Sequence, residues 1–90
     1  MRLDGRKVMI TGAGSGIGRA LAIEAARRGA HVILSGRHVA ALQETAGMAP
    51  ARMQILVLDL ADQAARAQVA EQIRALTGGL DVLINNAGIV

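Results

Sequence analysis

Short apolar runs alternate along this chain with longer segments in which apolar residues recur every three or four positions. The runs are typical of strands buried on both faces of a parallel sheet, and the periodic segments are typical of amphipathic helices. We predict strands over Lys7–Thr11, His31–Ser35, Gln54–Asp59 and Leu80–Asn85. We predict helices over Arg19–Arg28, over Val39–Ala46, and from an N-cap at Asp62 to the Gly78-Gly79 pair.

Each predicted helix has an apolar stripe that we expect to pack on the sheet. The stripes are Ile17, Leu21 and Ala25 in the first helix, Val39, Leu42 and Ala46 in the second, and Ala65, Val69, Ile73 and Leu76 in the third. We expect an ion pair between Glu24 and Arg28, and a helix end at Gly29.

Strands that alternate with helices of this length require right-handed parallel crossovers. The sequence therefore predicts an α/β fold: a Rossmann-like, doubly wound parallel sheet with strand order 3-2-1-4 and three helices. This corresponds to the first half of such a sheet, and we interpret residues 1–90 as one domain truncated after its fourth strand.

A glycine-rich turn, Thr11-Gly12-Ala13-Gly14-Ser15-Gly16-Ile17-Gly18, joins the first predicted strand to the first predicted helix. This arrangement suits the pyrophosphate of a dinucleotide, which accepts from N–H groups at a helix N-terminus. Gly12 allows the sharp turn, Gly16 removes a Cβ where the backbone must approach the phosphates, and Gly18 allows the helix to pack closely on the strand. No Gly-Lys-Ser/Thr follows, which excludes a nucleoside-triphosphate P-loop.

Composition excludes several other classes of function. The nine arginines and the single lysine are scattered among seven acidic residues, and no aromatic residue is present, so nucleic-acid binding is not expected. The absence of cysteine excludes disulfides and thiolate metal sites. With neither an apolar leader at the N-terminus nor an apolar stretch of about 20 residues, we expect a cytoplasmic protein without a membrane span.

The glycine turn, with its Thr-Gly-x-x-x-Gly-x-Gly spacing, is followed by Asp59 after the third strand and by Asn85-Asn86-Ala87-Gly88 after the fourth. Together these motifs resemble those of the short-chain dehydrogenase/reductase family, and the resemblance covers the whole chain. It implies that Gly12, Gly16 and Ile17 line the pyrophosphate of a nicotinamide cofactor. It also implies that Gly14 and Ser15 lie near the adenosine ribose.

The same resemblance implies roles after the third and fourth strands. Asp59 and Leu60 should border the adenine, although Asp59 is also suited to a turn at a strand end. Asn86, Ala87 and Gly88 should lie under the nicotinamide ribose. The two asparagines have a structural alternative, in which their side-chain amides tie the fourth strand to the first, and for Asn85 we favour this structural role.

The end of the second strand bears on the choice of cofactor. NAD enzymes usually carry an acid there to hold the ribose 2′-OH, whereas this chain has Gly36, Arg37 and His38. A guanidinium binds a 2′-phosphate with charge-assisted hydrogen bonds, so we expect NADP(H) to be preferred over NAD(H). Arg37 is otherwise an ordinary surface arginine, and we interpret His38 as a surface residue.

The family resemblance also implies a catalytic Tyr-x-x-x-Lys pair and a serine, and none of these is identifiable here. The chain has no tyrosine, and its only lysine, Lys7, opens the first strand. Ser15 and Ser35 lie in or beside the cofactor site. We therefore assign no catalytic residue and no metal ligand within the 90 residues, and we expect this chain alone to be inactive.

Two functions remain open at this stage. The first is the N-terminal portion of an NADP(H)-dependent oxidoreductase that transfers hydride between nicotinamide and a small carbonyl or alcohol substrate, as a homo-oligomer in its full-length form. The second is a stand-alone, non-catalytic NADP-binding module that completes its sheet by oligomerisation. For the isolated 90-residue chain we expect marginal stability and self-association.

Overall fold

The computed structural model describes residues 2–14, 16–49, 51–57 and 63–86. Within these ranges the elements are β1 (Lys7–Thr11), α1 (Gly16–Arg27), β2 (His31–Gly36), α2 (Val39–Ala46), β3 (Met53–Val57), α3 (Gln63–Thr77) and β4 (Val82–Ile84). The strands form one parallel sheet in the order β3-β2-β1-β4. The predicted fold class and strand order are therefore confirmed.

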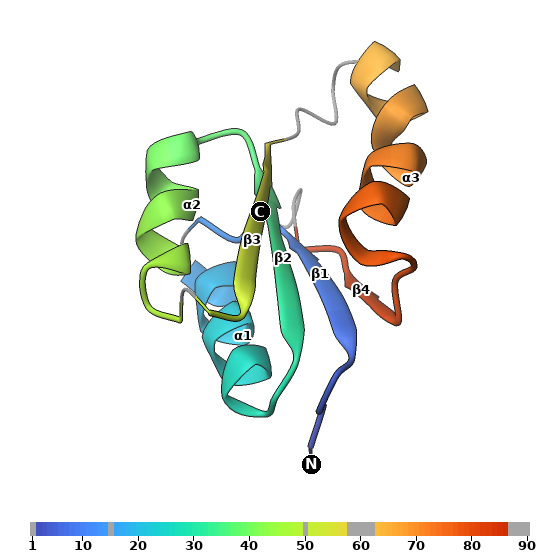
Figure 1. Ribbon diagram of the computed structural model, residues 1–90. Helices are drawn as coiled ribbons and strands as arrows, with labels where there is room; N and C mark the ends of the chain where they lie inside the picture. Colours follow the sequence, from blue (N-terminus) through green and yellow to red (C-terminus); the bar gives the residue numbers. More distant parts are fainter. Residues whose placement is uncertain (1, 15, 50, 58–62, 87–90) are drawn as a thin grey trace.

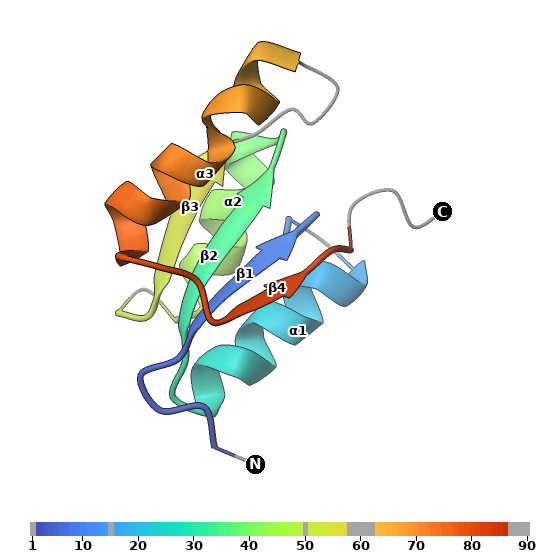
Figure 2. The same ribbon diagram turned by 90° about the vertical axis from the view of Figure 1, so that its right-hand side faces the viewer.

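The three helices cover both faces of the sheet. Helices α1 and α2 pack on one face, and α3 lies on the opposite face (Figure 1). Figure 2 shows β4 beside β1, with α1 behind the sheet and α3 in front of it in that view. This is the doubly wound arrangement that right-handed crossovers produce.

The core follows the alternation of side chains along the two central strands. Val8 and Ile10 of β1, with Val32 and Leu34 of β2, are buried against α1 and α2. The intervening Met9 and Ile33 are buried on the α3 side, where Ile73 and Leu80 pack against them. Strands buried on both faces explain why β1 and β2 are continuous apolar runs.

The predicted packing stripe of the first helix is wrong. Ile17 is 65% exposed and Leu21 is 37% exposed, and only Ala25 of the predicted stripe is buried. The buried face of α1 consists instead of Gly18, Ala22, Ala25 and Ala26. These small side chains let the helix approach the sheet closely, and that approach turns the larger side chains outward.

The buried face of α2 also differs in part from the predicted stripe. Leu42 is 1% exposed as expected, but Val39 is 44% exposed, and the fully buried partner of Leu42 is Thr45. Thr45 is buried because its hydroxyl is hydrogen-bonded on both sides, which offsets the cost of removing it from water. Ala46 packs partly buried against the core.

The remaining differences are at element ends. Helix α1 begins three residues earlier than predicted, at Gly16, and β2 continues to Gly36. Strand β4 is shorter than the predicted Leu80–Asn85 and covers only Val82–Ile84. In α3, Ile73 packs as predicted, whereas Leu76 is 40% exposed. The side chains of Ala65 and Val69, and the N-cap at Asp62, lie outside the described residues.

Two local predictions hold at the end of α1. Arg28 Nε lies 2.9 Å from Glu24 Oε1, and Gly29 ends the helix with a φ of 96°. Each helix in the described residues is too short or too polar to span a bilayer.

Candidate cofactor-binding site

The carboxyl ends of the parallel strands meet at one edge of the sheet. In the register of the sheet, Thr11 of β1 pairs with Ser35 of β2, and Ile10 pairs with Ile84 of β4. The glycine turn, Arg37 and Asn86 follow these strands directly, so the topology brings them to the same edge. Ligands of doubly wound sheets bind at this edge, where the strand order reverses.

At two positions of the glycine turn, the backbone has a conformation that only glycine adopts easily. Gly12 has a φ of 64° and Gly16 a φ of 57°, both in the left-handed region. A Cβ at Gly16 would meet no heavy atom within 4 Å, so the backbone is open to a ligand at the first residue of α1. N–H groups in the first turn of a helix lack intrahelical acceptors and favour anions.

Gly18 is a point of close approach between α1 and the loop. A Cβ built there would lie 2.1 Å from the Gly12 carbonyl oxygen and 2.8 Å from Asn86 Nδ2. Any side chain at this position therefore forces the helix away from β1. The role predicted for Gly18, close packing of the helix on its strand, is what the structure shows.

The two asparagines after β4 are hydrogen-bonded to the end of β1. The Asn86 backbone N–H donates to Thr11 Oγ1 at 2.8 Å, and Asn86 Nδ2 donates to the Gly12 carbonyl at 3.2 Å. Thr11 Oγ1 lies 3.1 Å from Asn85 Oδ1. The structural alternative raised for these residues is thus present, and it also holds Asn86 beside the glycine turn.

Arg37 lies just beyond β2 with its side chain exposed. It makes no hydrogen bond or ion pair with the part of the chain that the structure describes. Gly36 has room for a side chain, because a Cβ there would meet the Leu42 methyl groups at an ordinary 3.5 Å. His38 is the exposed N-cap of α2, and its side chain makes no capping hydrogen bond.

Comparison with known proteins matches residues 6–90 to the family described as short chain dehydrogenase. The chain belongs to this family. It is 40% identical over 96 residues to 3beta-hydroxysteroid dehydrogenase of Mediterraneibacter gnavus, covering 99% of this chain and 33% of that protein. It is 40% identical over 89 residues to the 3-oxoacyl-(acyl-carrier-protein) reductase FabG of Escherichia coli, covering 99% of this chain and 36% of that protein.

Solved structures of the short-chain dehydrogenase family have the same fold. The crystal structure of L-sorbose reductase from Gluconobacter frateurii, complexed with NADPH and L-sorbose, superposes with a TM-score of 0.87 at 38% identity. The match covers 98% of this chain and 35% of that one. The chain thus spans about a third of the length of these family members.

Five residues assigned from the family resemblance lie outside the described residues: Ser15, Asp59, Leu60, Ala87 and Gly88. Their roles remain predictions.

Two residues beside the glycine turn were not predicted from the sequence. Arg19 of α1 and Thr45 of α2 hydrogen-bond to the turn and to each other. Arg19 is one of nine arginines, and nothing in the sequence distinguishes it. Thr45 could have been noticed, because it lies on the inner face of a predicted helix and a buried hydroxyl requires a hydrogen-bonding partner.

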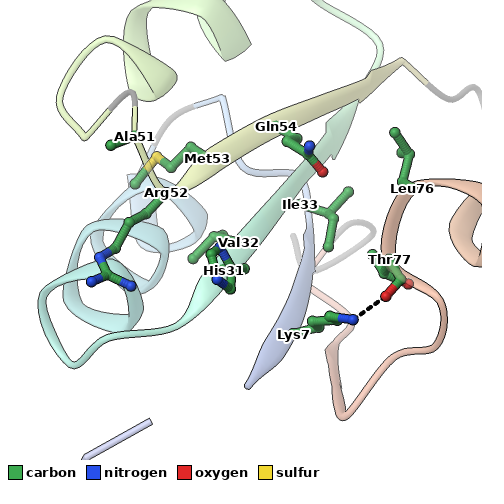
Figure 3. Close-up of a pocket in the computed structure, with 10 residues that line it drawn as sticks. All are labelled: Lys7, His31, Val32, Ile33, Ala51, Arg52, Met53, Gln54, Leu76 and Thr77. Atoms are coloured by element: carbon green, nitrogen blue, oxygen red, sulfur yellow. Dashed lines mark hydrogen bonds between the residues drawn. The ribbon is translucent and has the colours of Figure 1, made fainter. Parts of the chain in front are cut away.

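A cavity of about 320 Å³ lies at the opposite end of the sheet from the glycine turn. Figure 3 shows it between the amino ends of the strands and the end of α3, with Lys7 Nζ directed at the Thr77 carbonyl. Asp4 is near this end too, against Gly29, and the Arg2 side chain lowers the pKa of its carboxyl by hydrogen bonding. Neither feature belongs to the cofactor edge.

Proposed function

We propose that residues 1–90 form the cofactor-binding portion of an NADP(H)-dependent short-chain oxidoreductase. The protein would transfer hydride between nicotinamide and a small carbonyl or alcohol substrate. Two features at the same edge of the sheet carry the proposal. One is the open glycine turn after β1, and the other is Arg37 after β2, which is exposed and has no partner among the described residues.

The open turn is suited to a diphosphate. Gly12 and Gly16 give the turn its conformation, and the first turn of α1 supplies N–H donors beside Ile17 and Gly18. Gly14 and Ser15 would lie toward the adenosine ribose.

The other proposed contacts follow β3 and β4. Asp59 and Leu60 would border the adenine. Asn86, Ala87 and Gly88 would lie under the nicotinamide ribose, with Asn86 held there by its bonds to Thr11 and Gly12. When bound, the cofactor supplies the hydride that a carbonyl carbon accepts, or accepts one from an alcohol.

The preference for NADP(H) rests on charge at the end of β2. No acid stands at Gly36, and packing does not force a glycine there, since a Cβ meets only ordinary contacts. Arg37 is exposed and has no counter-ion in the described chain to compete with a phosphate. The NADPH bound to L-sorbose reductase, a family member of the same fold, supports this choice.

Substrate recognition and proton transfer would come from residues outside these 90, because the chain has no tyrosine. Carbonyl and alcohol substrates are the class suggested by the names of the relatives, which act on steroid, acyl and sugar groups. Homo-oligomerisation and a cytoplasmic location are further parts of the proposal.

The preference is tested by titrating the full-length protein with NADPH and with NADH at low ionic strength. We expect NADPH to bind more tightly, and Arg37→Ala to weaken NADPH binding by roughly 10- to 100-fold, the loss of a charge-assisted pair. NADH binding should be unaffected. The matched control, Arg27→Ala, removes an exposed arginine at the far end of α1 and should change neither affinity.

Equal affinities of the parent protein for the two nucleotides would contradict the NADP(H) assignment. A stand-alone binding module would show the same nucleotide preference but no nicotinamide oxidation with any carbonyl substrate. Measuring NADPH oxidation against a panel of ketones, sugars and acyl thioesters therefore separates the two functions.

A further inference from the structure

The side chain of Arg19 connects α1, α2 and the glycine turn. Its Nη2 donates to the Gly14 carbonyl at 2.6 Å, and its Nε donates to Thr45 Oγ1 at 2.9 Å. On the exposed side of the network, Nη1 lies 3.3 Å from Glu44 Oε1. The Arg19 side chain is only 23% exposed, so most of it is covered by the elements that it joins.

Thr45 extends the same network to the preceding peptide of the turn. It is fully buried, accepts from Arg19 and donates to the Ala13 carbonyl at 3.0 Å, with the Ala41 carbonyl as an alternative acceptor at 3.2 Å. The consecutive carbonyls of Ala13 and Gly14 are thereby directed at Thr45 of α2 and at the Arg19 guanidinium.

The orientation of these carbonyls determines where the loop's donors point. A trans peptide holds its C=O and N–H on opposite sides. With the Ala13 carbonyl directed at Thr45, the Gly14 N–H is directed away from α2. Gly14 also packs closely against α2, since a Cβ added there would lie only 2.9 Å from Ala41 Cβ.

The helix dipole disfavours Arg19, and burial disfavours Thr45. Arg19 lies in the first turn of α1, where the helix dipole does not favour a cation. Thr45 occupies a core position next to Leu42 that an aliphatic side chain fills more favourably. Both residue types make sense as hydrogen-bonding partners of the turn.

We propose that Arg19 and Thr45 are positioning residues that hold the glycine turn in its dinucleotide-binding conformation. The inference rests on the proposed function of that turn. The network also ties the turn to α2, which begins two residues after Arg37, so it fixes the diphosphate end of the site relative to the 2′-phosphate end. The adenosine ribose, which Gly14 is proposed to approach, and the diphosphate are both common to NADPH and NADH, so the two nucleotides should depend on this network equally.

The test measures NADPH and NADH affinities of the full-length protein and its Arg19→Met and Thr45→Val variants, each at a temperature where its melting curve shows it folded. Arg19→Met should weaken both nucleotides by the same factor, about tenfold, leaving their ratio as in the parent. Thr45→Val should act in the same direction, and Thr45→Ser, which keeps the hydroxyl, should restore binding. Arg27→Met, the same change at an exposed site of α1, should have no effect.

Three results would overturn the inference. Parental affinity in both Arg19→Met and Thr45→Val would show that the network is not needed for binding. Weakening of NADPH alone would make Arg19 a contact of the 2′-phosphate. Failure of Thr45→Ser to restore binding would reduce Thr45 to a packing role. A parent protein that binds neither nucleotide would instead refute the proposed function itself.

Discussion

At the scale of single residues, the missing side chain of Gly18 sets how closely α1 can approach the turn after β1. A Cβ built there would lie 2.1 Å from the Gly12 carbonyl oxygen, and the spacing of the turn predicts this close approach. The bonds of Arg19 to Thr45 and Glu44 join residues about 25 positions apart. No local pattern marks such pairs, because they depend on how α1 and α2 meet.

The close approach at Gly18 leads to a direct prediction. Gly18→Ala should lower the free energy of unfolding by about 1–3 kcal/mol, because the helix must shift to admit the methyl group. Dinucleotide affinity should fall as well, since the shift moves the first turn of α1. Urea denaturation and nucleotide titration measure the two effects.

Gly47→Ala is the matched control. Gly47 has a helical φ of −63°, and its Cβ would meet only ordinary contacts at 3.4 and 3.5 Å. This change should leave stability equal to the parent or raise it by up to about 1 kcal/mol. Equal destabilisation by both substitutions would show that the space at Gly18 is not what matters.

At the scale of elements, the alternation of apolar runs and periodic segments predicted each strand and helix that the structure describes, but not the full buried faces of α1 and α2. Ile17 and Leu21 fit a helical stripe by spacing, yet alanines and a glycine form the buried face of α1. Periodicity identifies where large apolar residues fall. It does not show whether the helix buries these large residues, or buries small residues that let its backbone lie closer to the sheet.

Helix α2 allows the observed face to be tested against the predicted one. Leu42→Ala should cost about 2–5 kcal/mol of stability, because Leu42 is buried in the core. Val39→Ala, on the same helix and 44% exposed, should cost no more than about 0.5 kcal/mol. Comparable losses in urea denaturation would mean that Val39 also packs in the core, as its sequence position suggested.

At the scale of the whole molecule, right-handed parallel crossovers together with the strand order of a doubly wound sheet predicted the order β3-β2-β1-β4. That order places the glycine turn, Arg37 and Asn86 at a single edge, although they are far apart in the sequence. The cavity beside Lys7 and Thr77 was not predicted, because it forms where α3 meets the amino ends of strands distant in sequence.

The most direct test of the central claim is a crystal structure of the full-length protein with NADPH. We expect the diphosphate against residues 12–18, the nicotinamide ribose beside Asn86, and the 2′-phosphate within hydrogen-bonding distance of the Arg37 guanidinium. Binding of the nucleotide at the opposite end of the sheet, or a 2′-phosphate that Arg37 does not contact, would contradict it.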